Sequence, residues 1–294
     1  MAETGQRLGA HEIANGSEPR LGELLQGEGL LGPGDLERIA DEQAKSGMRF
    51  GEAAVSLGLI SQDELMRALS RRYDYAYLPA GGHNRLHPSL LALFDPFATG
   101  CEALRSLRSQ LLIDVFGQGR ATRALSIVSP GHGEGRSYVA ANLAILFSQM
   151  GERTLLIDAD LRKPGLHELF CLDNRYGLSN LLAGHCALND AIDVIPELPN
   201  LTVLKGGAVP PNPLELLSRG RLRELIDLVR KHFDVILIDT TAANDGSDAV
   251  RVAHAAGFAM VLACAGQTGV RPLTSLVSQL RQAHVELAGC VMNR

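Results

Sequence analysis

From residue 101 onwards, short apolar runs alternate with longer amphipathic stretches. The apolar runs have the length and composition of buried strands. They lie near residues 124–128, 154–158, 201–205, 234–238, 258–264 and 286–291. Between them, apolar residues recur with helical spacing, as in the segment from Ser137 to Met150, which ends at Gly151. Strands and helices in this order predict an α/β fold with a mostly parallel sheet and helices on both faces.

The N-terminal third of the chain has a different pattern. Residues 1–17 are polar and are expected to form a disordered tail. Residues 18–79 carry leucines at helical spacing and predict a small all-α unit. Residues 80–100 contain several prolines and glycines and predict a linker. The α/β unit is therefore expected to span residues 101–294.

The small helical unit contains an internal repeat. Gly22 and Gly29 of the first copy recur as Gly51 and Gly58, in both cases 29 positions later. Each copy predicts a short helix, a turn at the second glycine and another helix. From packing alone, the pattern predicts a pair of helical hairpins that bury their repeated leucines.

Composition narrows the classes of partner and the location. The net charge is −5 without a dense block of lysine and arginine, which argues against nucleic acid as a partner. The five cysteines have no paired or metal-binding spacing, as expected for reduced thiols of a cytoplasmic protein. The apolar runs are too short to span a bilayer, and the N-terminus lacks a signal-peptide core. We therefore expect any membrane association to come through a partner.

A glycine-rich turn joins the predicted strand 124–128 to the helix that follows it. Such a turn directs backbone N–H groups towards an anion at the positive end of a helix, which is a common phosphate site. Ser137 occupies the position of a hydroxyl that binds Mg²⁺. Pro130 and Arg136 replace the first glycine and the lysine of the usual G-x-x-x-x-G-K-[ST] pattern. The candidate nucleotide-binding residues are Gly131, Gly133, Glu134, Gly135, Arg136, Ser137 and Tyr138.

Carboxylates follow two of the other predicted strands. Asp158 and Asp160 are two positions apart and share one face of the chain, and Asp239 ends the strand near 234–238. In a parallel sheet, the C-terminal ends of the strands lie at the edge where ligands bind. We therefore expect these carboxylates to face the glycine-rich turn. Ser137, Asp158 and Asp239 are the candidate Mg²⁺ ligands.

Five segments together resemble one family. Residues 133–137 (GEGRS), 155–164 (LLIDADLRKP) and 235–240 (VILIDT) resemble the Walker A, A′ and B motifs of bacterial tyrosine kinases of polysaccharide export, the CpsD/CapB type. Residues 102–108 are similar to their E-x-x-R-x-x-R helix, and residues 207–217 to their G-x-x-P-P-N-P-x-E-L-L segment. The GEGRS variant is similar to the EpsG-like, chain-length-determinant branch. The resemblance covers the chain from about Cys101 to its end.

The resemblance implies a P-loop fold of the MinD/ParA kind and an ATP- and Mg²⁺-dependent protein-tyrosine autokinase. It implies a role in exopolysaccharide biosynthesis, export and chain length, with activation by a membrane chain-length-determinant (Wzz-like) protein. Asp158, Asp160 and Arg136 are the implied catalytic residues, an aspartate orienting the tyrosine hydroxyl and Arg136 neutralising phosphate. The implied contacts within a homo-oligomer are Glu102, Arg105 and Arg108.

Both copies of the N-terminal repeat resemble a second family. Their pattern is similar to R-L-G-x-x-L-x-x-x-G-L-x(5)-L-x(6)-Q of the MshEN-type domain of type II secretion ATPases, whose tandem copies bind cyclic di-GMP. The second copy departs from it at Phe50 and Arg72. The resemblance implies that the glycines allow a close approach of backbone to ligand. The implied cyclic di-GMP contacts are Arg20, Leu21, Gly22, Gly29, Gln43, Arg49, Gly51 and Gly58.

Three functions stay open on the sequence, and the tyrosine kinase is the first of them. Arg136, together with Thr241 where the kinases usually have proline, leaves room for a non-catalytic adaptor that binds nucleotide and cyclic di-GMP. A partition ATPase of the MinD/ParA kind shares the Walker arrangement but normally has a second lysine near Gly131 and His132. The sequence ends without the kinases' tyrosine-rich segment, so the triplet within residues 73–77 is either an acceptor cluster or a packing feature.

Overall fold

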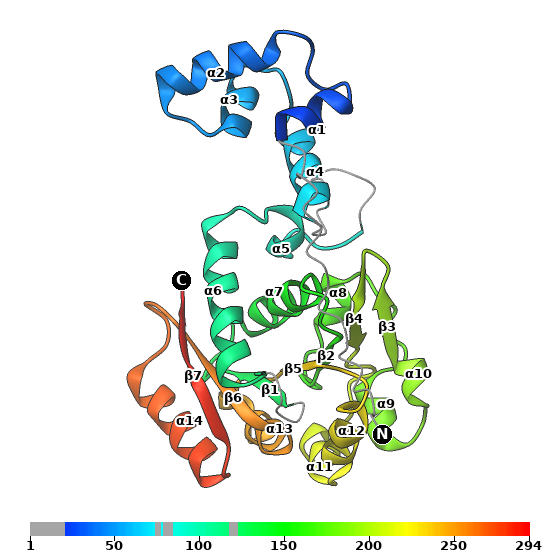
Figure 1. Cartoon of the computed structure of the whole chain (residues 1–294). Coiled ribbons are helices and arrows are strands. Elements are labelled where there is room, and N and C mark those ends of the chain that lie inside the picture. Colours follow the sequence, from blue (N-terminus) through cyan, green and yellow to red (C-terminus); the bar gives the residue numbers. More distant parts are fainter. Residues whose placement is uncertain (1–20, 74–77, 79–84, 118–122) are drawn as a thin grey trace, which may run out of the picture. The chain divides into compact units, whose positions relative to one another are not determined.

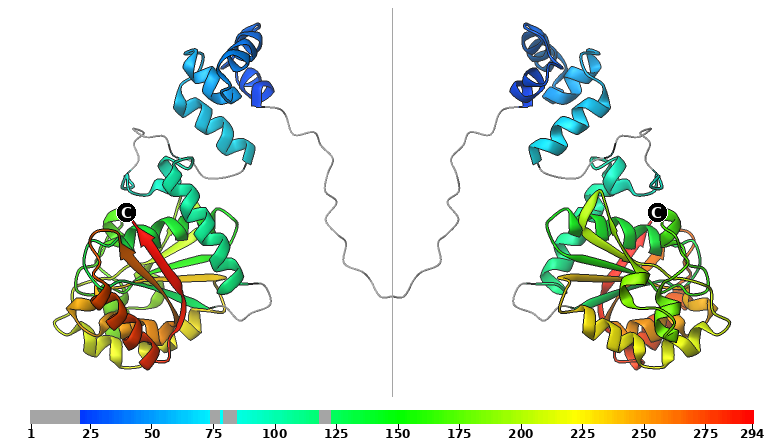
Figure 2. Two further views of the ribbon diagram at one scale, coloured as in Figure 1. Left: turned by 90° about the vertical axis from the view of Figure 1, so that its left-hand side faces the viewer. Right: turned by 90° about the vertical axis from the view of Figure 1, so that its right-hand side faces the viewer.

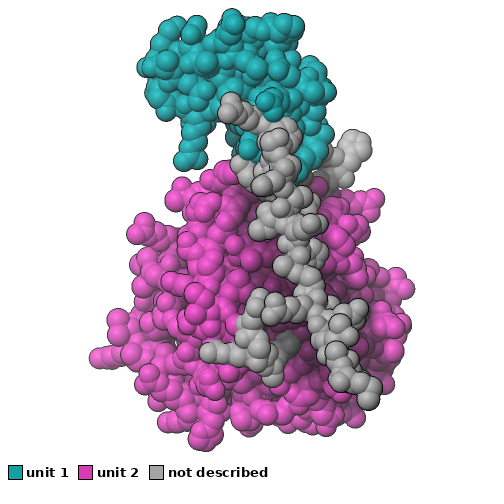
Figure 3. All heavy atoms as spheres, in the orientation of Figure 1, with its two compact units in different colours: residues 1–74 teal, residues 75–294 magenta. Residues whose placement is uncertain are grey.

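The computed structural model describes residues 21–73, 78, 85–117 and 123–294. The chain divides into two units, residues 1–74 and 75–294 (Figure 3). The predicted tail 1–17 lies outside the described residues, as do Arg20, Tyr75 and Tyr77 and the first part of the predicted linker, residues 80–84.

The larger unit is built on one seven-stranded sheet with the order β3-β4-β2-β5-β1-β6-β7 (Figure 1). Every neighbouring pair is parallel except β3 with β4. The mostly parallel α/β fold is thereby confirmed. The short antiparallel strand β3 was not predicted, because its half-exposed residues form no apolar run. The strands are β1 Ala124–Val128, β2 Thr154–Asp158, β3 Ile192–Ile195, β4 Leu198–Leu204, β5 Val235–Asp239, β6 Gly257–Cys264 and β7 Glu286–Asn293.

Helices cover both faces of this sheet (Figure 2). Successive strand residues point to opposite faces, so Leu156 belongs to the core beneath α6 and α7, whereas Leu155 and Ile157 belong to the core beneath α9 and α11 to α13. The helices of this unit are α5 Leu91–Phe94, α6 Thr99–Asp114, α7 Arg136–Ser148, α8 Leu166–Leu169, α9 Leu178–Ala183, α10 Leu188–Ala191, α11 Pro213–Ser218, α12 Arg221–Val229, α13 Asp248–Ala256 and α14 Val270–Gln282, with a 3₁₀ turn at Ala243–Asp245.

The predicted linker 80–100 is wrong from residue 85 onwards. Leu90 and Leu93 are fully buried in the same core as α7. The buried Asn142 of α7 accepts a hydrogen bond from the N–H of Ala92 at 2.9 Å and donates to the carbonyl of Ser89 at 3.0 Å. This segment belongs to the larger unit. The sequence did not predict the packing of this segment, because turn residues surround Pro88 and the buried leucines lie in a run too short to show helical spacing.

The smaller unit has four helices: α1 Leu21–Gly27, α2 Asp35–Ser46, α3 Phe50–Ser56 and α4 Gln62–Tyr73. They form the two helix–turn–helix copies that the repeat predicts. Gly29 and Gly58 take the left-handed conformation at the two turns, with φ of 73° and 67°. The unit has its own apolar core, which includes Leu25, Ile39 and Leu65.

No helix in the described parts of the chain is long and apolar enough to span a membrane.

Candidate functional site: a phosphate loop beside paired carboxylates

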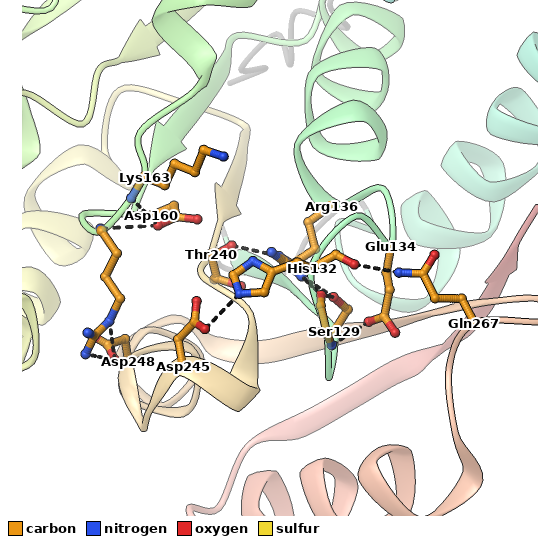
Figure 4. Close-up of polar contacts among 12 residues, drawn as sticks. Ser129, His132, Glu134, Arg136, Asp160, Lys163, Thr240, Asp245, Asp248 and Gln267 are labelled. Atoms are coloured by element: carbon orange, nitrogen blue, oxygen red, sulfur yellow. Dashed lines mark hydrogen bonds and ion pairs between the residues drawn. The ribbon is translucent and has the colours of Figure 1, made fainter.

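The glycine-rich turn is a loop from Ser129 to Gly135 at the C-terminal end of β1 (Figure 4). Gly133 and Gly135 have positive φ, 69° and 95°, a conformation that L-residues with side chains rarely adopt. α7 begins directly after the loop at Arg136, so the loop leads into the N-terminus of a long helix. The backbone therefore has the form expected of a phosphate-binding loop.

Arg136 is turned into the protein and is only 8% exposed. Its Nε donates to the carbonyl of Thr240 at 2.8 Å, and its Nη1 donates to the carbonyl of Gly131 at 2.5 Å and to the hydroxyl of Ser129. The guanidinium therefore joins the phosphate loop to the residue that follows β5. The neighbouring Thr241 is also buried, and its hydroxyl has no hydrogen-bond partner among the described residues.

Asp158 and Asp239 face each other across neighbouring strands. They are register partners of β2 and β5, and each is at most 1% exposed. The Ser137 side chain lies beside Asp239 and acts to lower the pKa of this carboxyl, so the loop hydroxyl and the carboxylate approach one another. Asp158 accepts from the N–H groups of Gly165 and Leu166, both at 3.0 Å. Burial together with the neighbouring acid raises the pKa of Asp158 to about 8.

The pKa of Asp239 is raised too, mainly by burial. Two buried acids with raised pKa values need either a proton or a cation between them. Their oxygens and the Ser137 hydroxyl are hard donors of the kind that Mg²⁺ prefers. The three residues therefore fit the predicted Mg²⁺. Their oxygen donors are of the kind that this ion prefers, and the two buried acids need a positive charge beside them.

Asp160 lies at the start of the loop that follows β2. Its carboxylate accepts from the N–H groups of Arg162 and Lys163 at 3.2 and 2.8 Å, and burial raises its pKa. Arg162 in turn donates to the fully buried Asp248 at 2.9 Å. The A′ segment is thereby joined to the start of α13.

Several contacts around the loop were not predicted. His132 pairs with Asp245 at 2.8 Å, and its carbonyl accepts from Gln267 at 2.6 Å. Thr268 donates to the buried carboxylate of Glu134 at 2.5 Å, and Asn293 donates to the Glu134 carbonyl at 3.2 Å. No local pattern in the sequence could indicate these contacts, because each one joins segments more than a hundred positions apart.

A cavity of about 680 Å³ lies next to the start of α7, between α6, α7 and β7. Tyr138 lies half-buried in its wall, and burial raises the pKa of this phenol. Tyr138 directly follows the loop hydroxyl of Ser137, so the cavity adjoins the phosphate site. Its other lining residues are Thr99, Gly100, Ala103, Leu104, Leu107, Val139, Val291, Met292, Asn293 and Arg294.

The predicted oligomer residues lie on α6. Glu102 and Arg105 pair with each other within the chain. Arg108 is half-buried and donates to the carbonyl of Leu146 at 3.2 Å, near the end of α7. Within one chain, Arg108 therefore stabilises the packing of α6 on α7.

The predicted cyclic di-GMP residues of the smaller unit have packing partners. A Cβ on Gly22 would lie 2.9 Å from Leu36, and one on Gly51 would lie 2.7 Å from Leu65. These two glycines are required by the packing of the helices, so their presence needs no ligand. Gln43 donates to the carbonyl of Met48 at 3.2 Å, the N–H of Arg49 donates to Glu52 at 3.0 Å, and Leu21 begins α1.

The larger unit is similar to known proteins along most of its length. The tyrosine-protein kinase YwqD of Bacillus subtilis is 32% identical over 210 residues, which are 71% of this chain and 87% of that protein. The tyrosine-protein kinase etk of Escherichia coli K12 is 32% identical over 211 residues, which are 72% of this chain and 29% of that protein. No protein-family model matches the chain.

Solved structures agree with these relatives. The kinase domain of the Escherichia coli tyrosine kinase ETK has a TM-score of 0.67 at 31% identity and covers 74% of this chain and 89% of that one. The septum site-determining protein MinD of Pyrococcus horikoshii, complexed with Mg-ADP, has a TM-score of 0.52 at 28% identity and covers 59% and 70%. The higher TM-score and coverage of the kinase domain favour the tyrosine kinases over the partition ATPase alternative. The chain belongs to the family of bacterial tyrosine kinases.

Proposed function

We propose that this protein binds ATP and Mg²⁺ and transfers the γ-phosphoryl group to tyrosine, as a regulator of exopolysaccharide biosynthesis, export and chain length. One observation carries the proposal: the Ser137 hydroxyl meets Asp239 beside Asp158, at the mouth of a phosphate loop. A relative named as a tyrosine-protein kinase of the cps region of Klebsiella pneumoniae supports the polysaccharide role.

In the proposed reaction, the tyrosine hydroxyl oxygen bonds to the γ-phosphorus while the bond from that phosphorus to the β–γ bridging oxygen breaks. The backbone of residues 131–137 holds the phosphates, and Asp160 or Asp158 accepts the tyrosine proton. Ser137 and Asp239, with Asp158, would hold Mg²⁺, which neutralises phosphate charge when bound. Phosphoryl transfer depends mainly on such positioning and charge neutralisation, so this small set of groups suffices.

The cavity beside the loop is proposed to take the base and ribose of the nucleotide. Its volume of about 680 Å³ lies within the usual range for small-molecule sites. Its wall is mostly apolar, and Asn293 supplies an amide that can bond to the edge of a base. The phosphates would then reach the loop directly past Tyr138.

Phosphotyrosine formation on the purified chain with ATP and Mg²⁺ tests the proposal. We expect incorporation that disappears in Asp160→Asn while nucleotide binding remains. The exposed Asp173, which pairs with Arg175 at the surface, offers a matched control as Asp173→Asn. Equal incorporation in Asp160→Asn and the wild type would refute the role given to Asp160.

A non-catalytic adaptor is the second candidate, and the contacts of Arg136 favour it. Two of its guanidinium nitrogens bond to three acceptors within the protein, whereas a lysine in this position is free to follow the phosphates. ATP binding without phosphotyrosine, even with the cytoplasmic segment of a membrane chain-length-determinant partner added, would establish the adaptor. Gain of phosphotyrosine in Arg136→Lys would identify this residue as the reason.

Cyclic di-GMP is proposed as a ligand of the smaller unit. Its two copies of the MshEN-type motif support the proposal, with Arg20, Arg49 and Gln43 as the polar contacts. Calorimetric titration of the full chain with cyclic di-GMP, repeated on Arg49→Ala, tests it. Heat that is unchanged in the variant, or absent in the wild type, would remove the ligand from the proposal.

The partner and assembly follow from the same proposal. We expect a homo-oligomer with Glu102, Arg105 and Arg108 at its contact, located in the cytoplasm and held at the inner membrane by a Wzz-like protein. Sedimentation of the wild type and of Arg105→Ala, with and without ATP, tests the assembly. An unchanged mass in Arg105→Ala would exclude this residue from the contact.

A further inference from the structure

The first glycine of the phosphate loop is held on both sides by the loop's own charged residues. The N–H of Gly131 donates to Glu134 Oε2 at 2.7 Å. The Gly131 carbonyl accepts from Arg136 Nη1 at 2.5 Å and from the Ser129 hydroxyl at 3.1 Å. The Glu134 carboxylate and the Arg136 guanidinium, two positions apart, therefore determine how Gly131 is oriented.

The second carboxylate oxygen of Glu134 connects the loop to another part of the sheet. Glu134 Oε1 accepts from the Thr268 hydroxyl at 2.5 Å, and that hydroxyl oxygen accepts from the N–H of Cys264 at 2.7 Å. A continuous chain of hydrogen bonds thus runs from the end of β6 through Thr268 and Glu134 to Gly131. Gln267 adds a parallel contact to the loop carbonyl of His132.

Glu134 is only 2% exposed, and none of the ion pairs among the described residues includes it. A buried carboxylate is costly unless its oxygens accept hydrogen bonds, and here each oxygen has a donor. A glutamine could accept from the Gly131 N–H with its Oε1 and donate to the Thr268 hydroxyl oxygen with its Nε2, because that hydroxyl can turn to accept. The anchoring therefore does not require the negative charge, and this charge lies in a loop that is suited to receive anions.

We propose that Glu134, anchored by Thr268, is the positioning residue that keeps the phosphate loop in its nucleotide-binding shape, while its charge weakens the binding of phosphates. The inference rests on the proposed nucleotide-binding function and adds the β6–α14 segment to the site. Glu134 acts through the backbone of Gly131 and needs no contact with the nucleotide.

Calorimetric titration with ATP and Mg²⁺ separates the geometry from the charge. We expect Thr268→Val, which removes one buried hydrogen bond to Glu134, to weaken binding by about tenfold, and Glu134→Ala, which removes two, to weaken it at least as much. Glu134→Gln is expected to bind as tightly as the wild type or more tightly, and Thr268→Ser to restore wild-type affinity. Thr274→Val on the exposed side of α14 is the matched control, since its hydroxyl bonds only within its own helix.

Hydrogen exchange of the peptide covering residues 129–137 gives a readout that needs no nucleotide. We expect faster exchange in Glu134→Ala and Thr268→Val, but not in Glu134→Gln or Thr274→Val. If the wild type bound no nucleotide, the proposed function would fail while this exchange still tested the anchor. Equal exchange in all variants would overturn the inference, as would equal losses of affinity in Glu134→Gln and Glu134→Ala.

A merely structural role predicts a different result. In that case Thr268→Val would lower the thermal unfolding midpoint, an effect that the inference does not require. The folded variant would keep the wild-type affinity for ATP. That combination would also overturn the inference.

Discussion

The phosphate loop of the larger unit and the repeats of the smaller unit both depend on glycine, but they place it beside different neighbours. Gly133 and Gly135 lie in a loop that surrounds the buried side chains of Glu134 and Arg136. Gly51, by contrast, meets the side chain of Leu65. In the phosphate loop the glycines therefore accompany buried charge, whereas in the smaller unit helix packing alone accounts for Gly51.

The two units also differ in what they bury. Asp158 and Asp239 are buried with raised pKa values, an arrangement that costs stability and is typical of functional sites. The buried core of the smaller unit is apolar, and the ion pairs of Arg38 with Asp35 and of Arg71 with Glu28 lie at the surface. A ligand of the smaller unit must therefore bind on its surface, whereas the nucleotide meets groups that are already desolvated.

The largest expected effect comes from Asp239→Asn. Removing this carboxylate should reduce phosphotyrosine formation by about a hundredfold or more, because it meets the Ser137 hydroxyl at the proposed metal site. The same change should raise the stability of the metal-free protein, since it removes one of two facing buried acids. Kinase assays and thermal unfolding without metal measure the two effects.

Lower stability together with lower activity in Asp239→Asn would contradict this contrast between the units. The carboxylate would then belong to the fold, as the leucines of the smaller unit do.

The pH dependence of stability should differ between the units. Asp158 has a folded-state pKa of about 8 against a usual value of 3.8. Between these values the folded chain keeps a proton that the unfolded chain releases, so the stability of the metal-free larger unit falls as pH rises. We expect its unfolding midpoint to decrease from pH 4 towards pH 8, and ATP with Mg²⁺ to reverse most of the decrease at high pH.

A flat midpoint across this range would contradict the raised pKa. Asp158→Asn is the matched variant, because it should remove most of the dependence.

Asn142→Ala tests whether residues 85–98 belong to the larger unit. The change leaves the buried N–H of Ala92 and the carbonyl of Ser89 without their partner, at a cost of about 2–3 kcal/mol. Denaturant unfolding measures the loss. Asn200→Ala removes a long 3.4 Å contact at the surface and should cost far less. Equal losses of unfolding free energy in the two variants would indicate that residues 85–98 are a linker and not part of the larger unit.

The smallest effect is expected in the smaller unit. Gly51→Ala places a Cβ 2.7 Å from a buried leucine and should destabilise this unit by about 1 kcal/mol or somewhat more. Gly27→Ala meets nothing within 4 Å and should be neutral or slightly stabilising. ATP binding should be unchanged in both. Full stability of Gly51→Ala would reopen a ligand role for this glycine.

Much of the fold could be predicted because local pattern determines it. Apolar runs indicated six strands, and the alternation of strands with helices indicated the parallel sheet. Strand β3 and the packed segment 85–98 were missed because each is short and partly polar. β3 pairs with β4, which directly follows it, whereas the segment 85–98 is stabilised by contacts with the distant α7. Asn142, for example, stands in an ordinary helical pattern, and its role depends on a segment fifty positions earlier.

The sequence by itself determined the fold class, the repeat and the residues of the three Walker segments, because spacing along one strand or turn is a local property. Only the tertiary structure decided which groups meet. It directed Arg136 to Thr240, turned Gly22 and Gly51 towards leucines, and brought Thr268 to Glu134 across more than a hundred residues. These contacts depend on the order of strands in the sheet, which brings the end of β6 beside the loop that follows β1.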